Sequence, residues 1–521
     1  MTNSPKDLKC SNRWLKFFKK WHRWPGIIMA LFFVLWAASG IVMNHRKLVS
    51  GMDISRNCLP KEYRYVNWNN AAVRSAVNIG QDSLLVYGNI GIWLTDSSFA
   101  HFSDFNNGLP EGIDNRKISC LLSSPGGTLY AGTLFGVFYF DNSAAKWIKL
   151  AIPSNDQRIQ WLEEKEGKVL ILNRSELFLA EDDPGHFSAT AIPLPAPDGY
   201  DNKAGLFRTI WVIHSGEIYG NIGKLIVDLL GFIVIFLAIT GALHFSMPYA
   251  LRRLKKSKRS LSTASSTKRF STKWHKKTGI WIAIFILINT LTGMFLRPPL
   301  LITIANARVG KIPLSVLNTP NPWEDKLRAV IYDEELGGYL FGTSEGIFFA
   351  EKGLQTEMVA PPGQPPLSVM GINVFRKEGK GTYLVGTFNG LYDWMPRIGF
   401  SMDHITGKVP QQLNAASKPF GDEMAAGFWA LGGGKEIYFD YNYGAKVLGN
   451  QGHFVAMPQE ILEKSPMSLW NFALEVHTAR IFKPLIGDFY ILLIPLMGIF
   501  GTILVISGLV VWIKLYVRKN R

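Results

Sequence analysis

Four long apolar segments constrain what this chain can fold into. They run Pro25–Asn44, Ile222–Leu243, Gly279–Leu296 and Leu485–Leu515. Because the hydrocarbon core of a bilayer is crossed by roughly 20 residues of helix, each segment is long enough to span a membrane. Hydrophobic residues make up 47% of the chain and aromatic residues 13%. The sequence therefore predicts a membrane α plus β protein in which a four-helix transmembrane bundle carries two segments outside the bilayer.

The position of the positive charge predicts the orientation of these spans. The formal net charge is +16, and the basic residues gather at 1–23, 252–277 and 514–521, which together contain a single acid. Short basic pieces beside apolar spans stay in the cytoplasm. These tracts are thus explained by topology and lipid headgroups, and we expect no nucleic-acid partner.

Alternation from a cytoplasmic N-terminus gives the expected domain order, with both termini inside. It comprises a cytoplasmic N-terminus at 1–24, a span at 25–44, an external β-rich segment at 45–221, a span at 222–243, a basic cytoplasmic loop at 244–278, a span at 279–296, a second external segment at 297–484, a span at 485–515 and a cytoplasmic tail at 516–521.

Six of the ten histidines lie at the rims of the four spans, namely His22, His45, His214, His244, His275 and His477. A neutral imidazole at the mouth of a helix bundle is a suitable axial ligand for haem iron. Two haems with two imidazoles each would use four of the six. The alternative is that these residues are ordinary interfacial side chains. Asp228 and Asp488, near span ends, are candidates to orient an imidazole.

An internal repeat relates the spans. His22 to Gly26 matches His275 to Gly279, and Ser39-Gly40 matches Thr292-Gly293. The second and fourth spans match more loosely, through the pairs His214 and His477, Gly223 and Gly487, and Thr240-Gly241 and Ser507-Gly508. Each copy is a helix, an external segment and a return helix, so duplication predicts two parallel repeats.

This arrangement resembles the PepSY-associated transmembrane helix family. The resemblance rests on the His-x-x-x-Gly start, the Ser/Thr-Gly end and the His-led return helix, and it covers about a fifth of the chain. The family includes inner-membrane ferric-siderophore reductases, so the resemblance implies a bacterial inner membrane and b-type haem. It points to His22, His45, His214, His275 and His477, with His244 as an additional candidate. Neither external segment contains a recognisable PepSY module.

The external segments carry a glycine-rich repeat. It reads Tyr130–Phe138, Leu340–Phe348 and Leu384–Tyr392, with eroded copies at Val86–Trp93 and Ile171–Phe178. Each copy predicts a hairpin whose turn needs a residue at positive φ. The spacing is typical of propeller blades, and the motif resembles two-component-regulator-type propellers. We expect the two segments to combine into one propeller-like head, with two separate β-sandwiches as the alternative.

The chain has three cysteines. Cys10 is expected in the cytoplasm, whereas Cys58 and Cys120 share the first external segment and could pair there. The absence of CxxCH argues against covalent haem attachment. No Walker loop, dinucleotide fingerprint, HExxH or nucleophile elbow occurs, and His101, His186, His404 and His453 lack metal-ligand spacing and read as loop residues.

The leading hypothesis is haem-dependent transmembrane electron transfer. Electrons from a quinol or a separate reductase would pass through two haems to a periplasmic ferric complex of the siderophore type, which would make the chain a ferric-chelate reductase. The alternative is a membrane-anchored propeller-type sensor or interaction protein without redox chemistry. A transporter ranks last, because the spans contain few ionisable groups at mid-depth that could form an ion path. Asn289 is their most central polar side chain.

Overall fold

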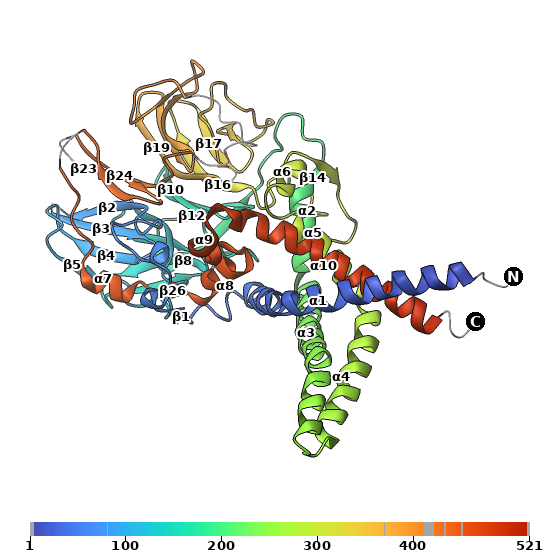
Figure 1. Ribbon diagram of the computed structural model, residues 1–521. Coiled ribbons are helices and arrows are strands. Elements are labelled where there is room, and N and C mark those ends of the chain that lie inside the picture. Colours follow the sequence, from blue (N-terminus) through green and yellow to red (C-terminus); the bar gives the residue numbers. More distant parts are fainter. Residues whose placement is uncertain are drawn as a thin grey trace. The chain divides into compact units, whose positions relative to one another are not determined.

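The computed structural model describes residues 5–80, 82–368, 370–410, 421–431, 434–449 and 452–517, and for residues 5–12 and 516–517 the backbone alone. Cys10 and the last four residues of the expected cytoplasmic tail thus lie outside the described side chains. The chain divides into two compact units (Figure 1). The helical unit comprises 1–46, 202–318 and 470–521, and the sheet unit comprises 47–201 and 319–469.

The helical unit is built from long apolar helices joined by short ones. Its helices are α1 (Pro5–Asn44), α2 (Leu206–Ser215), α3 (Gly220–Lys256), α4 (Ser262–Trp281), α5 (Ala283–Met294), α6 (Leu300–Ile304), α8 (Leu469–His477), α9 (Lys483–Ile486) and α10 (Tyr490–Trp512). Short 3-10 turns lie at Glu217–Tyr219, Arg480–Phe482 and Gly487–Phe489, and a π turn follows α10 at Ile513–Val517. Strands β14 (Lys203–Gly205) and β15 (Arg308–Gly310) form an antiparallel pair.

Three helices of the described chain are long and apolar enough to cross a membrane, and they cover Arg13–Asn44, Glu217–Lys256 and Arg480–Leu515. The third expected span, at 279–296, is not one continuous helix, and it adds a fourth span only if its two bent helices cross the membrane together. Helices α4 and α5 occupy this region and are bent by 67°. The bend falls at Ile282, whose backbone leaves the helical region at φ −110° and ψ 5°. Gly279 and the β-branched residues around the break are weak helix formers, which favours a bend here.

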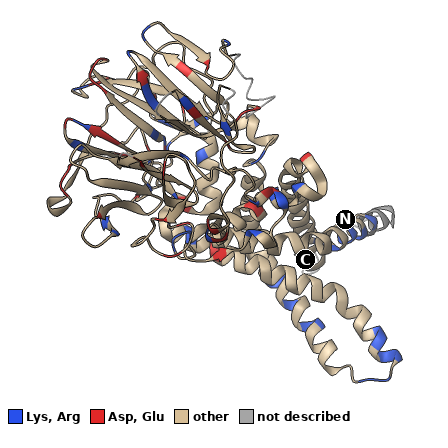
Figure 2. Ribbon diagram, turned by 90° about the vertical axis from the view of Figure 1, so that its left-hand side faces the viewer, with Lys and Arg blue, Asp and Glu red and all other residues tan. Residues whose placement is uncertain are grey.

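The expected cytoplasmic loop at 244–278 is helical through most of its length. It contains the end of α3 and most of α4, two helices that pack against each other. Lysine and arginine residues gather at the far end of this hairpin (Figure 2). Helix α1 also packs against α3 and α10, and α10 packs against α5. Glycines allow these close approaches: a Cβ at Gly231 of α3 would lie 3.2 Å from Ile41 of α1.

Among its described residues, the sheet unit contains six sheets of three or four strands, three from each external segment, and one two-stranded pair that joins the two segments. The first segment forms sheets β2 (Ser75–Gly80), β3 (Ser83–Gly88), β4 (Gly91–Thr95) and β5 (Phe102–Asp104); β6 (Ile118–Ser123), β7 (Leu129–Thr133), β8 (Gly136–Asp141) and β9 (Lys146–Leu150); and β10 (Trp161–Lys165), β11 (Lys168–Leu172), β12 (Leu177–Glu181) and β13 (Ala189–Ile192).

The second segment forms the other three. They are β16 (Leu327–Asp333), β17 (Gly338–Thr343) and β18 (Ile347–Glu351); β19 (Ile372–Gly379), β20 (Thr382–Thr387), β21 (Gly390–Met395) and β22 (Phe400–Asp403); and β23 (Ala425–Leu431), β24 (Lys435–Asp440) and β25 (Gly444–Val447). Strand β1 (Asp53–Ile54) pairs with β26 (Met467–Ser468), helix α7 covers Gln459–Lys464, and 3-10 turns lie at Arg56–Cys58, Lys61–Tyr63 and Pro184–His186.

Each of the six sheets is an antiparallel meander in which consecutive strands pair. The first strand of each sheet contacts the first strand of the next, in the order β2, β6, β10, β16, β19 and β23, and β23 contacts β2. At this last junction the Phe428 amide donates to the Arg74 carbonyl at 3.0 Å. The two external segments therefore share one compact unit.

The glycine-rich repeats are hairpins between the second and third strands of their sheets. In the copy at Tyr130–Phe138, the Thr133 hydroxyl donates to the Gly136 carbonyl at 3.0 Å and accepts from the Phe135 amide at 3.1 Å. Gly136 has φ +146°, a conformation that side-chain-bearing residues rarely adopt. Thr343 and Gly346 repeat the closing hydrogen bond at 2.8 Å. The threonine and second glycine of the motif therefore close the turn.

Both described cysteines are free thiols. Cys120 is buried in β6, whereas Cys58 is exposed. The pairing that the shared external segment allowed is absent from the structure.

Candidate functional site

Two pairs of histidines meet inside the helical unit. The first pair joins His22 of α1 to His275 of α4, with ring centroids 6.2 Å apart and ring planes at 69°. The second joins His214, near the end of α2, to His477, the last residue of α8, with centroids 6.1 Å apart and planes at 57°. The structure thus brings together four of the six histidines predicted from the sequence.

Each of the four rings is held in the same way, by hydrogen bonds from Nδ1 to a facing helix. Nδ1 lies near a backbone carbonyl and near a hydroxyl three residues later. The contacts are His22 with Leu504 (3.0 Å) and Ser507 (3.2 Å), His275 with Leu237 (3.1 Å) and Thr240 (3.2 Å), His214 with Asn289 (3.1 Å) and Thr292 (3.2 Å), and His477 with Trp36 (3.1 Å) and Ser39 (3.1 Å).

These contacts define the tautomer of each ring. A carbonyl oxygen only accepts, so Nδ1 carries the proton and donates it to the carbonyl. The lone pair is then on Nε2, and no hydrogen bond among the described residues uses Nε2 of these four rings. An imidazole oriented through Nδ1 with Nε2 open is the form that binds a metal.

A glycine follows each hydroxyl residue and gives the ring its place. A Cβ would lie 2.8 Å from Cε1 of His214 if added at Gly293, and 2.9 Å from Cε1 of His22 if added at Gly508. The corresponding distances are 3.1 Å at Gly241 beside His275 and 3.2 Å at Gly40 beside His477. Each glycine therefore forms a cradle that any larger residue would fill.

The two pairs have the spacing of a bis-imidazole metal site. Two imidazoles on opposite sides of one metal ion, each bound at about 2.0 Å, place their ring centroids about 6 Å apart. The observed separations are 6.2 and 6.1 Å. The donor set, two neutral imidazoles with oriented Nδ1 protons, is the one that b-type haem iron uses.

The internal repeat explains the pairing. His22 and His275 hold equivalent positions in the two copies, as do His214 and His477, so each pair needs one residue from each copy. Helix α1 connects the two pairs, because it carries His22 and also Ser39, which holds His477. Ser39 lies seventeen residues beyond His22, or about 25 Å of helix. This distance approaches the thickness of the hydrocarbon core.

His45 and His244 have no histidine partner in the described structure. Nε2 of His45 lies 2.7 Å from Asp228, a carboxylate that also accepts from Asn44 at 2.8 Å. Nδ1 of His244 lies 2.8 Å from the Thr272 hydroxyl. Asp228 thus orients an imidazole, as the sequence suggested, but one outside the two pairs.

The second aspartate of that prediction, Asp488, contacts no histidine in the described structure. It lies 3.9 Å from Lys483, and its side chain is 88% exposed.

The sequence reasoning missed the partners of the four rings. The Ser/Thr-Gly pairs were visible as repeat markers, yet their contact with histidines from other helices depends on how the helices pack. The sequence also showed no sign of the contacts of His404 in the sheet unit, because the absence of metal-ligand spacing indicated an ordinary loop residue. Its Nδ1 lies 2.9 Å from Asp393 and its Nε2 3.1 Å from Glu436. These carboxylates raise the pKa of His404 to about 9.

No group of three or more histidine, cysteine or acidic side chains among the described residues could hold a metal ion. Because their rings meet in pairs and are oriented through Nδ1, the four histidines of the helical unit are the candidate site, and they lie in or beside apolar helices. Together these features define a multi-pass membrane protein with paired histidines in its helical unit.

The chain belongs to the family of the PepSY-associated TM region. The family model matches twice, at residues 6–247 and 202–515, and so confirms the resemblance noted in the sequence. No curated protein matches the chain.

Several solved structures are similar to the chain at low identity. One is the extracellular domain of a putative hybrid two component system from B. thetaiotaomicron, with 12% identity and a TM-score of 0.34 over 72% of this chain and 32% of that one. Another is PorZ, a surface component of the type-IX secretion system of Porphyromonas gingivalis, with 10% identity and a TM-score of 0.32 over 72% of this chain and 38% of that one. The chain thus spans about a third of the length of these proteins.

Proposed function

We propose that the chain is a transmembrane electron carrier that holds two b-type haems, one between His22 and His275 and the other between His214 and His477. The observation that carries this proposal is the double pairing of imidazoles at 6.2 and 6.1 Å, with all four Nδ1 atoms bonded to facing helices. A bound haem supplies one-electron redox chemistry at its iron.

The chain's own residues set the conditions for that chemistry. The carbonyls of Leu504, Leu237, Asn289 and Trp36 hold the Nδ1 protons and present Nε2 as a ligand. The hydrogen bond to the carbonyl also makes the imidazole a stronger donor to iron. The two pairs, spaced about 25 Å apart along α1, would lie toward opposite faces of the bilayer.

The direction of transfer follows from the proposed topology. The basic tracts at both termini and at 252–277 support a topology in which those parts would lie in the cytoplasm and the sheet unit outside, at the inner membrane of a bacterium. Electrons would enter from a quinol or a separate reductase and leave to a ferric complex of the siderophore type. Reduction of Fe(III) weakens its bonds to hard oxygen ligands, so the complex would release its metal.

We also propose that the six sheets form a propeller-type head. The succession of contacts between first strands, from β2 round to β23 and back to β2, supports a closed ring of six blades. Such heads often serve as binding surfaces. A second candidate function, a membrane-anchored sensor or interaction protein, rests on this unit and predicts a colourless protein.

Absorption spectra test the electron-carrier proposal. Full-length protein from haem-replete cells should bind two haems per chain and show a reduced-minus-oxidised spectrum with dithionite. The His→Ala variants of His22, His275, His214 and His477 should each bind about one haem. The matched controls His45→Ala and His244→Ala should keep two. A colourless wild-type protein, or equal loss in the controls, would overturn the proposal.

A further inference from the structure

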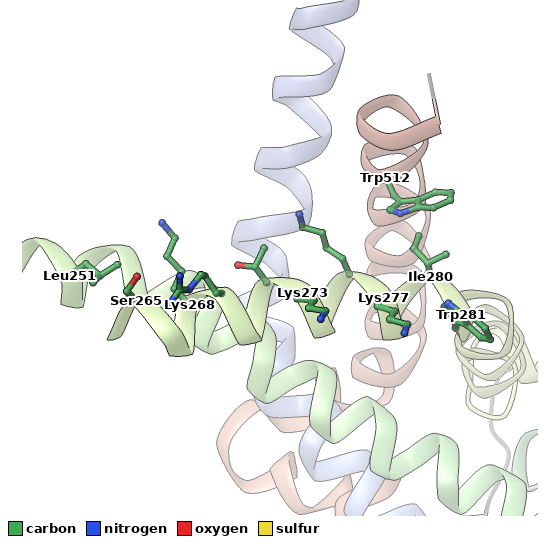
Figure 3. Close-up of a pocket in the computed structure, with 11 residues that line it drawn as sticks. Leu251, Ser265, Lys268, Lys273, Lys277, Ile280, Trp281 and Trp512 are labelled. Atoms are coloured by element: carbon green, nitrogen blue, oxygen red, sulfur yellow. The ribbon is translucent and has the colours of Figure 1, made fainter. Parts of the chain in front are cut away.

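A basic pocket lies on the helical unit, along α4. It has a volume of about 900 Å³ and is formed by residues of α3, α4 and the end of α10. Figure 3 shows Lys268, Lys273 and Lys277 along α4, with Trp281 and Trp512 at one end.

The charge of the pocket is of one sign. Lys268, Arg269, Lys273, Lys276 and Lys277 line it, and no acidic residue does. Positions 269, 273 and 276 follow one face of the helix, since residues three and four apart are neighbours. All five side chains are exposed. The surrounding tract, 252–277, holds eleven basic residues and no acid. The pocket therefore attracts an anion.

Apart from Ser265 and Thr272, the rest of the lining is apolar. Leu251, Ile280 and the indoles of Trp281 and Trp512 complete the wall, and Trp281 is 76% exposed. Tryptophan is enriched where headgroups meet hydrocarbon, because its ring is apolar and its N–H is polar. A free anion would use only the cationic part of this pocket. A phosphate that carries acyl chains would use both parts.

We propose that this pocket binds an anionic phospholipid, with the headgroup phosphate on the lysines of α4 and an acyl chain against Trp281 and Trp512. Basic pockets between membrane helices recognise such headgroups. The inference rests on membrane insertion and does not depend on haem binding.

Native mass spectrometry of the full chain in detergent tests whether the pocket binds an anionic phospholipid. The probes are phosphatidylglycerol and phosphatidylcholine with the same acyl chains. The pocket variant carries Lys268→Gln, Lys273→Gln and Lys277→Gln. A matched control carries Lys255→Gln, Lys256→Gln and Lys258→Gln, which remove the same charge from exposed positions outside the pocket lining. Thermal unfolding followed by circular dichroism should be the same for all three proteins.

We expect wild type and control to bind phosphatidylglycerol more tightly than phosphatidylcholine. The affinity of the pocket variant for phosphatidylglycerol should fall roughly a hundredfold, because each lysine contributes a factor of about five. Equal affinity of pocket and control variants would overturn the proposal, as would equal binding of the two lipids. Displacement of the lipid by inorganic phosphate would assign the pocket to a free anion instead. Failure of wild type to bind phosphatidylglycerol would also refute the proposal. An acidic protein would then be the alternative partner of the basic pocket.

Discussion

The glycine cradles give a sharp test of how the histidines are held. In Gly293→Ala the new methyl group would lie 2.8 Å from Cε1 and 3.3 Å from Nδ1 of His214. Ordinary van der Waals contact begins at 3.4 Å, so the ring must retreat by at least about 0.6 Å. The ring is held by the Asn289 carbonyl and the Thr292 hydroxyl, at 3.1 and 3.2 Å, and a retreat stretches both contacts.

The size of the effect follows from these two hydrogen bonds. Loss of one typically costs about 1 kcal/mol, and loss of an outer-shell partner typically lowers metal affinity about 10- to 100-fold. We therefore expect Gly293→Ala to bind the haem proposed for the His214 and His477 pair at least about tenfold more weakly. The other haem should be retained, because its cradles are Gly241 and Gly508.

The assay is haem titration of the purified variant, followed by the Soret band and by haem content per chain. Gly279→Ala is the matched control: it is also a glycine of a bent membrane helix, but its Cβ would meet only Leu237, at 3.9 Å. Gly40→Ala, with 3.2 Å to His477, should have a smaller effect than Gly293→Ala. If Gly293→Ala binds haem as tightly as Gly279→Ala, the cradle argument is refuted.

Three further predictions concern the sheet unit. The pKa of His404 is about 9 in the folded state against 6.5 in the unfolded state. Its contribution to stability is therefore complete below pH 6.5 and is lost as pH rises through 9. His404→Gln should flatten the dependence of the free energy of unfolding on pH, measured by denaturant titration. With Cys10 changed to Ser, a maleimide should label the exposed Cys58, while Cys120 should react only after unfolding, because burial raises its pKa to about 12. Trp323→Ala should lower the free energy of unfolding by about 3 to 5 kcal/mol, because it empties a fully buried site.

Each of these has an outcome that contradicts it. A wild-type stability that rises between pH 6.5 and 9 relative to His404→Gln would contradict the ion pairs of His404. Labelling of native Cys120 at the rate of Cys58 would show that β6 is open. Tyr443→Ala, at a residue that is 65% exposed, serves as the control for Trp323→Ala and should change stability by less than about 0.5 kcal/mol. Similar losses in both variants would contradict the tryptophan core.

Much of the architecture could be predicted because it is local. The three long spans follow from apolar runs, and the hairpins follow from a motif whose threonine and glycine close their own turn. The bend at Ile282 was not predictable from apolar length, because a hydrophobic run reports burial and not helix continuity. The contacts of His404 were likewise hidden, since Asp393 of β21 and Glu436 of β24 reach this turn residue only in the folded sheet unit.

The sequence by itself determined which residues are available for the site: six histidines at the rims of the spans, four Ser/Thr-Gly pairs and a duplication. Tertiary structure alone decided which ring meets which, because each pair joins one copy to the other and each ring is held by a helix distant in the chain. It also separated His45 and His244 from the pairs, although the sequence analysis kept all six histidines as candidate ligands. Spacing along a helix records faces and turns, whereas the meeting of two rings depends on packing between helices, which no local pattern encodes.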